Sequence, residues 1–200
     1  MSAEQGAGPI DTREKILAIL SRNARVSLVE LANMLGISHV AVRKHIQKLE
    51  SSGILRIQGN INLHALGYKL TLVFMEVVNE EYMRKIIDKF RDCPRIVFLA
   101  NMIGGYNLVA LMYAENEDVL ECFSSVCAIR TMEGIRRTEV YLLSSIVKPE
   151  HLPIQLPTSR SRKESPCGHN CSKCSKYMIN KCLGCPATMY YKGGITKAGK

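Results

Sequence analysis

Apolar residues recur at three- and four-residue intervals in three short runs near the N-terminus, a spacing that predicts three amphipathic helices. Asp11 with Glu14 and Ser27 with Glu30 each have the spacing of a capping box, and Ser38 is the predicted cap of the third helix. The residues expected to face inward are Ile16, Leu17, Leu20, Leu28, Leu31, Ala32, Leu35, Ala41 or Val42, Ile46 and Leu49. This pattern predicts a small helical domain.

Turn residues place the second and third helices next to each other. Gly36 and Ile37 predict a tight turn between them, which is the arrangement of a helix-turn-helix, and Gly53 is the expected end of the third helix. Residues 54–61, interrupted by Gln58-Gly59-Asn60, predict a small β-hairpin, the wing of a winged helix.

The region from residue 68 to 150 alternates between strand-like and helix-like patterns. Strands are predicted at 68–78, 95–102, 107–114 and 136–147, and helices at 80–92 and 118–129. The order β-α-β-β-α-β is that of a split βαβ unit, a ferredoxin-like α/β sandwich in which two helices cover one face of an antiparallel sheet. The predicted fold class is therefore α+β.

Five of the eight cysteines fall within nineteen residues near the C-terminus. They are Cys167, Cys171, Cys174, Cys182 and Cys185. No secretory signal begins the sequence, and clustered cysteines in a cytosolic chain favour metal ligation over disulfides. Four thiolates around Zn²⁺ would form a closed structural site, whereas three close thiols and a distant fourth would hold a [4Fe–4S] cluster.

The spacing does not decide between these two cofactors. The seven-residue spacer is short for a zinc ribbon, and Cys185-Pro186 resembles ferredoxin runs, whereas zinc is common in DNA-associated proteins. Cys167 is the predicted spare thiol of a zinc site, and His169 is a remote substitute ligand. Cys93, Cys122 and Cys127 lie far from the cluster in sequence and are interpreted as buried small hydrophobic residues.

Prolines after residue 148, followed by serine, arginine and lysine, predict a linker before the cysteine-rich segment. The predicted organisation is a disordered N-terminus (1–10), a winged helix-turn-helix DNA-binding domain (11–61), a hinge (62–67), a ferredoxin-like dimerisation or effector domain (68–150), a linker (151–165), a cysteine-rich metal-binding module (166–191) and a disordered tail (192–200).

Charge adds a candidate partner to this organisation. The formal net charge is +9, and residues 158–200 carry nine Lys or Arg against one acidic residue, whereas residues 68–157 carry ten against twelve. A nearly neutral centre between two basic ends indicates that both ends approach a polyanion, the alternative being a tail that is basic only for solubility.

The outward face of the third helix carries the candidate DNA-binding residues. They are Ser38, His39, Val40, Arg43, Lys44, Gln47 and Lys48, with Arg56 beyond the helix. Arg43 has the chemistry to bind guanine, and Gln47 that to bind adenine. Ser38 at the helix start suits a phosphate, and Lys48 and Arg56 are expected to contact the DNA backbone. The predicted partner is double-stranded DNA.

The segment DTREKILAILSRNARVSLVELANMLGISHVAVRKHIQKLESSGIL resembles the winged helix-turn-helix of the Lrp/AsnC family of transcription regulators. The resemblance covers about residues 10–150 and continues through Leu66-Gly67, through Gly104-x-Tyr106-Asn107, and through Gly134-Ile135 with Thr138. It implies a ferredoxin-like domain that forms a homodimer or a higher homo-oligomer and binds small effectors such as amino acids at subunit contacts.

The same resemblance assigns an effector region to Gly104, Gly105, Tyr106 and Asn107. Asn107 stands where the family usually has Asp, so one charge expected near the ammonium group of an amino acid is missing. The cysteine-rich segment lies beyond the usual end of the family.

No catalytic constellation is evident, so the chain is predicted to be a regulator rather than an enzyme. One alternative is a tetrapyrrole-processing enzyme on the same two-domain architecture, in which His64 and His151 would meet in space. The other is an effector-binding or assembly module that does not bind DNA. With no run of about 18 apolar residues, no membrane span is expected, and we predict a cytoplasmic protein.

Overall fold

The computed structural model describes residues 10–125 and 127–194. The chain divides between Gly59 and Asn60 into two compact units, which are described separately. Within the described residues, no helix has the length and the apolar composition that crossing a membrane requires.

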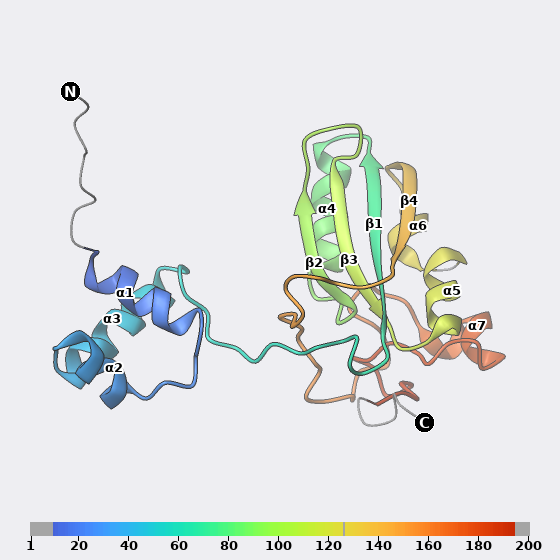
Figure 1. Ribbon diagram of the computed structural model, residues 1–200. Coiled ribbons are helices and arrows are strands. Elements are labelled where there is room, and N and C mark those ends of the chain that lie inside the picture. Colours follow the sequence, from blue (N-terminus) through green and yellow to red (C-terminus); the bar gives the residue numbers. More distant parts are fainter. Residues whose placement is uncertain (1–9, 126, 195–200) are drawn as a thin grey trace. The chain divides into compact units, whose positions relative to one another are not determined.

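The first unit contains helices α1 (Thr12–Leu20), α2 (Leu28–Leu35) and α3 (His39–Ser51), drawn in blue in Figure 1. Its buried core consists of Ile16, Leu20, Leu31, Ala32, Val42 and Leu49. All six were predicted to face inward, because residues three and four positions apart share one face of a helix.

Side-chain caps at Ser27 and Ser38 explain where α2 and α3 begin. The Ser27 hydroxyl accepts a hydrogen bond from the Glu30 amide (3.1 Å), and the Glu30 carboxylate accepts one from the Ser27 amide (2.8 Å), which confirms the predicted capping box. The box predicted at Asp11 is wrong, because the Asp11 carboxylate makes no capping bond and instead pairs with Arg13 (2.9 Å). A charge-assisted bond to a guanidinium is stronger than a bond to a neutral amide.

The predicted wing is also wrong. After Gly53 the chain runs to residue 60 without strand pairing. Ile61 forms an isolated antiparallel bridge with Leu152, in which each amide donates to the other residue's carbonyl (2.9 Å). Ile61 was predicted to begin the return strand of the hairpin. Because its amide and its carbonyl both bond to Leu152, they cannot pair with the first strand of a hairpin.

The second unit is built on a four-stranded antiparallel sheet in the order β2-β3-β1-β4. The strands are β1 (Lys69–Val77), β2 (Ile96–Asn101), β3 (Leu108–Ala114) and β4 (Ile135–Leu143). Register shifts occur at Glu76/Val77 and between Ile96 and Phe98. This is the predicted ferredoxin-like topology.

Helices α4 (Glu80–Phe90), α5 (Glu117–Ser125) and α6 (Ala128–Thr131) pack on one face of this sheet (Figure 1). The core between them consists of Val73, Met75, Val77, Met83, Ile86, Phe90, Leu108, Ala110, Met112, Ala114, Val119, Phe123 and Ile129. The single helix predicted over 118–129 is observed as two, because Cys127 adopts an extended conformation at the start of α6.

The opposite face is covered at one end by segments from before and after the sheet. Leu63, Leu152 and Ile154 are buried there against Tyr68, Leu70 and Tyr113. The predicted linker over 151–165 is therefore partly packed. Phe98 and Tyr141 remain about half exposed.

The cysteine-rich segment contains a 3₁₀ turn, η1 (Cys171–Lys173), and one helical turn, α7 (Ser175–Met178). It belongs to the same compact unit as the sheet and contacts α5 through Lys176–Glu121 and Lys181–Asp118 ion pairs. The segment is part of the folded second unit rather than an independent tail.

Candidate functional site

The outward face of α3 carries the predicted DNA-binding residues, and the structure exposes all of them. They are Ser38, His39, Val40, Arg43, Lys44, Gln47 and Lys48, and Arg56 beyond the helix is exposed as well. Val42 and Leu49 face the core, so the helix is anchored by one face and presents the other.

The charges of this face are available to a ligand. Among the described residues, no ion pair includes Arg43, Lys44 or Lys48. The Ser38 hydroxyl accepts a hydrogen bond from the Ala41 amide (3.2 Å) and caps the helix. A positive helix N-terminus followed by three unpaired cations suits a phosphate backbone.

The predicted effector residues lie in the turn between β2 and β3. Gly104 has φ +151°, a conformation that side chains disfavour. Tyr106 packs against Phe74 and under the Arg137 guanidinium, which lies 4.4 Å from the ring centre. Its hydroxyl is buried and makes no hydrogen bond within the described part of the chain.

Asn107 has a structural use that the sequence did not reveal. Its side-chain oxygen accepts a hydrogen bond from the Val77 amide and its side-chain nitrogen donates one to the Val77 carbonyl, both at 2.7 Å. The amide therefore extends the hydrogen bonding of β1, and a carboxylate would supply only the acceptor.

Asn107→Asp should destabilise the second unit by about 1 kcal/mol, because one hydrogen bond is lost and a carboxylate faces the Val77 carbonyl. Chemical denaturation measures this change, with Asn101→Asp on the exposed surface of β2 as the matched control. Equal stability of the two variants would show that the contact contributes nothing.

All eight cysteines of the chain line one cavity of about 90 Å³. The five predicted metal ligands are among them, together with Cys93, Cys122 and Cys127, which we had interpreted as ordinary core residues. Cys93 and Cys127 do also pack against the core, and Cys122 is buried. Sequence spacing gave no signal for this convergence, because these three residues lie 40 or more positions from the cluster.

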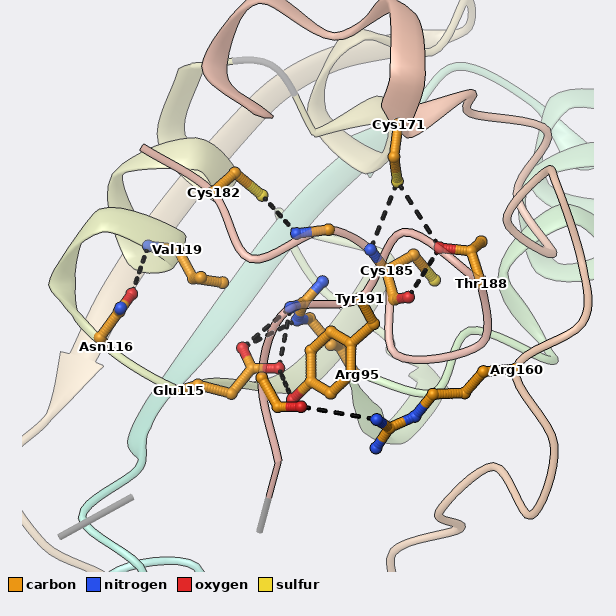
Figure 2. A network of polar contacts seen from close by, with 12 residues as sticks. Arg95, Glu115, Asn116, Val119, Arg160, Cys171, Cys182, Cys185, Thr188 and Tyr191 are labelled. Carbon is orange, nitrogen blue, oxygen red and sulfur yellow. Dashed lines mark hydrogen bonds and ion pairs between the residues drawn. The ribbon is translucent and has the colours of Figure 1, made fainter. Parts of the chain in front are cut away.

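Hydrogen-bond donors are directed at several of these sulfur atoms (Figure 2). The Cys185 amide donates to the Cys171 sulfur (3.3 Å), and the Gly184 amide donates to the Cys182 sulfur (3.4 Å). The Ser165 hydroxyl lies 3.1 Å from the Cys167 sulfur. Amide donors at cysteine sulfur favour the charged thiolate, the form that binds metals.

The cysteines differ in acidity. Contact between the Cys122 and Cys182 side chains lowers the pKa of Cys182 to about 6 and raises the pKa of Cys122. Burial raises the pKa of Cys93 to about 12 and that of Cys185 to about 11. Among the described residues, no three Cys, His, Asp or Glu side chains stand in the arrangement of a ready metal site.

A buried ion pair lies beside the cavity (Figure 2). The Arg95 guanidinium forms a bidentate ion pair with the Glu115 carboxylate, and the shortest N–O distance is 2.8 Å. The Tyr191 hydroxyl donates a hydrogen bond to the same carboxylate (2.7 Å). Arg95 also lies over the rings of Phe123 and Tyr191. This group was not predictable from sequence spacing, because Arg95 lies just before β2, Glu115 just after β3 and Tyr191 in the C-terminal segment.

The described part of the structure shows no direct bond between the two histidines of the enzyme alternative. His64 lines a cavity of about 220 Å³ with Glu150 and Leu152, and His151 is absent from that lining. Within residues 10–125 and 127–194, no hydrogen bond joins them.

Two family descriptions match the sequence. Winged helix-turn-helix DNA-binding matches residues 11–56, and the Lrp/AsnC ligand binding domain matches residues 70–153. Both matches end before the cysteine-rich segment.

Curated and solved proteins agree with these matches. The HTH-type transcriptional regulator LrpA of Pyrococcus horikoshii is 35% identical over 133 residues, which are 64% of this chain and 92% of the relative. The structure of Escherichia coli AsnC matches with a TM-score of 0.60 at 20% identity, over 70% of this chain and 95% of that one. The Neisseria meningitidis transcriptional regulator NMB0573, solved as an L-Met complex, matches with a TM-score of 0.59 at 17% identity, over 70% and 93%.

Proposed function

The chain belongs to the Lrp/AsnC family and is a DNA-binding transcription regulator, and we propose that α3 reads its operator while the cysteine-rich segment holds a metal. The observation that carries the DNA-reading proposal is the exposed face of α3, with three cations that no described carboxylate neutralises.

The residues of this face divide by chemistry into readers and anchors. Arg43 donates to guanine O6 and N7, and Gln47 pairs with adenine N6 and N7. Ser38 and the free amides at the start of α3 hold a phosphate, while Lys48 and Arg56 contact the backbone. His39, Val40 and Lys44 complete the surface that faces the groove.

The test is binding of the full chain to DNA from its own promoter, measured by fluorescence anisotropy over a range of salt concentrations. The promoter fragment should bind at least about 10³-fold more tightly than random DNA of equal length. Equal affinity for both fragments would contradict operator reading.

Lys48→Ala should weaken binding to promoter and random DNA alike, because a phosphate contact carries no sequence information. The slope of log affinity against log salt should fall by about one. Arg84→Ala on the exposed surface of α4 is the matched loss of one cation and should leave the slope unchanged.

Two copies of the chain are proposed to act together. A homodimer presents two α3 helices to major grooves about one helical turn apart, on a roughly palindromic site. The half-exposed Phe98 and Tyr141 on the sheet supply an apolar surface for association. Light scattering of the purified protein gives the mass, and a monomer at micromolar concentration would contradict this arrangement.

An amino-acid-like effector is proposed to bind near the turn from Gly104 to Asn107. Support comes from the matched ligand-binding description and from the L-Met complex of the Neisseria relative. The Asn107 side chain is committed to Val77, so the backbone amides of the glycines and the Tyr106 hydroxyl are the groups left for a ligand. Calorimetric titration with each amino acid tests this site.

The proposed metal is Zn²⁺ or the iron of a [4Fe–4S] cluster, bound by Cys167, Cys171, Cys174, Cys182 and Cys185 or by four of them. The amide donors aimed at the Cys171 and Cys182 sulfur atoms support thiolate ligands. Elemental and sulfide analysis of protein purified without oxygen decides between the two: about one zinc without sulfide, or iron with equal sulfide.

A further inference from the structure

Three cysteines of the ferredoxin-like domain face the same cavity as the five of the cysteine-rich segment. Cys93 follows α4, Cys122 lies on α5 and Cys127 precedes α6. The cavity is therefore lined jointly by the ferredoxin-like domain and the segment that follows it.

Helix α5 presents one face to the segment. Asp118 and Glu121 form ion pairs with Lys181 and Lys176, and Cys122 follows them on the same face. The Cys122 thiol donates to the Lys181 carbonyl at 3.6 Å. Cys122 thus lies at the contact between the ferredoxin-like domain and the cysteine-rich segment.

The cavity is unusual for a protein interior. Cores are packed to the density of organic crystals, and the empty cavities that do occur are lined by aliphatic and aromatic residues. The cavity of about 90 Å³ is lined by eight cysteines and is large enough to hold a metal ion. A purely structural role would not require every cysteine of the chain to face the same space.

The contacts of Cys122 lead to particular thiols of the segment. Cys122 lines the cavity together with Cys174 and Cys182, and its hydrogen bond to Lys181 places it beside the residue that precedes Cys182. Cys174 is the N-cap residue of α7, whose Lys176 pairs with Glu121, the neighbour of Cys122 on α5. Cysteine has a single side-chain torsion with three staggered positions, so a change of rotamer moves its sulfur without movement of the backbone.

We propose that Cys122 is a ligand of the metal centre, together with Cys174, Cys182 and a fourth thiol of the segment. The bound metal then ties the cysteine-rich segment to α5, so that metal occupancy is coupled to the regulatory domain itself. This inference rests on the proposed metal site and adds a ligand from outside the cysteine cluster.

The test compares full-length wild type with Cys122→Ser, Cys182→Ser and the control Ser125→Ala, which alters an exposed residue of the same helix. Zinc, iron and sulfide are measured in anaerobically purified protein. Co²⁺ affinity of the metal-free form is then titrated through its thiolate charge-transfer absorption. Cys122→Ser and Cys182→Ser should each bind Co²⁺ at least about 10-fold more weakly than wild type and Ser125→Ala.

The outcomes separate the two proposals. Wild-type affinity in Cys122→Ser, with loss in Cys182→Ser, would place the site in the segment alone and overturn this inference only. Wild type that contains no metal and binds no Co²⁺ would overturn the metal site as well.

A measurement on the unaltered chain covers the case in which Cys122→Ser does not fold. In protein loaded with ¹¹³Cd²⁺, a ¹¹³Cd–¹H correlation to the β-protons of Cys122 is expected. Correlations confined to the five segment cysteines would overturn the assignment.

Discussion

Glu115→Ala should destabilise the second unit by about 3–5 kcal/mol, the largest effect that we expect from a single substitution in this chain. The side chains of Arg95 and Glu115 are only 8% and 5% exposed. Removal of the carboxylate leaves the guanidinium buried without its partner, and the Tyr191 hydroxyl loses its acceptor as well. Guanidinium chloride denaturation followed by circular dichroism gives the free energy of unfolding.

Two further variants test whether burial causes the large effect of Glu115→Ala. Asp88→Ala removes an ion pair of similar length whose side chains are about 70% exposed, and should cost at most about 1 kcal/mol. The double variant Arg95→Met with Glu115→Ala should recover much of the loss, because no unpaired charge remains. A cost below 1 kcal/mol for Glu115→Ala alone would contradict this account.

The same contact explains why the cysteine-rich segment is not an independent tail. Tyr191 from the segment bonds to Glu115 at the end of β3, and its ring packs against Arg95. The segment should therefore unfold together with the sheet in one transition, and the cysteine-lined cavity should be lost in the same transition.

Local patterns in the sequence predicted the elements that depend on neighbours in the chain. The apolar spacing of Val42, Ile46 and Leu49 placed the exposed face of α3, and Ser27 with Glu30 placed the start of α2. The alternation from residue 68 onward predicted all four strands of the sheet. Each of these features is decided by residues within a few positions of one another.

Features that depend on distant partners were not predictable in this way. The prediction of a wing was wrong because Ile61 pairs with Leu152, 91 positions away. Cys122 was interpreted only as a core residue, because its hydrogen bond to Lys181 spans 59 positions. Asn107 was interpreted only as the loss of a charge, because its two hydrogen bonds to Val77 span 30 positions.

Arg43→Ala should weaken binding to promoter DNA by about 1–3 kcal/mol, a loss of roughly 5- to 150-fold in affinity. Arg43 is exposed on the outward face of α3 and has no acidic partner in the described part of the chain, so its five donors are free for a base edge. Binding to random DNA should change far less, because only one of several cations is lost.

The comparison with Lys48→Ala separates base reading from charge. Both variants lose one positive charge from the same helix. If α3 bound DNA through charge alone, both substitutions would reduce the affinity for promoter DNA equally. Base reading instead requires that Arg43→Ala reduce the ratio of promoter to random affinity, while Lys48→Ala leaves that ratio intact. Arg13→Ala, on α1 and paired with Asp11, is the control for an arginine outside the reading surface. An unchanged promoter footprint in Arg43→Ala would show that Arg43 does not recognise the operator. Recognition would then be assigned to Gln47 and to the start of α3.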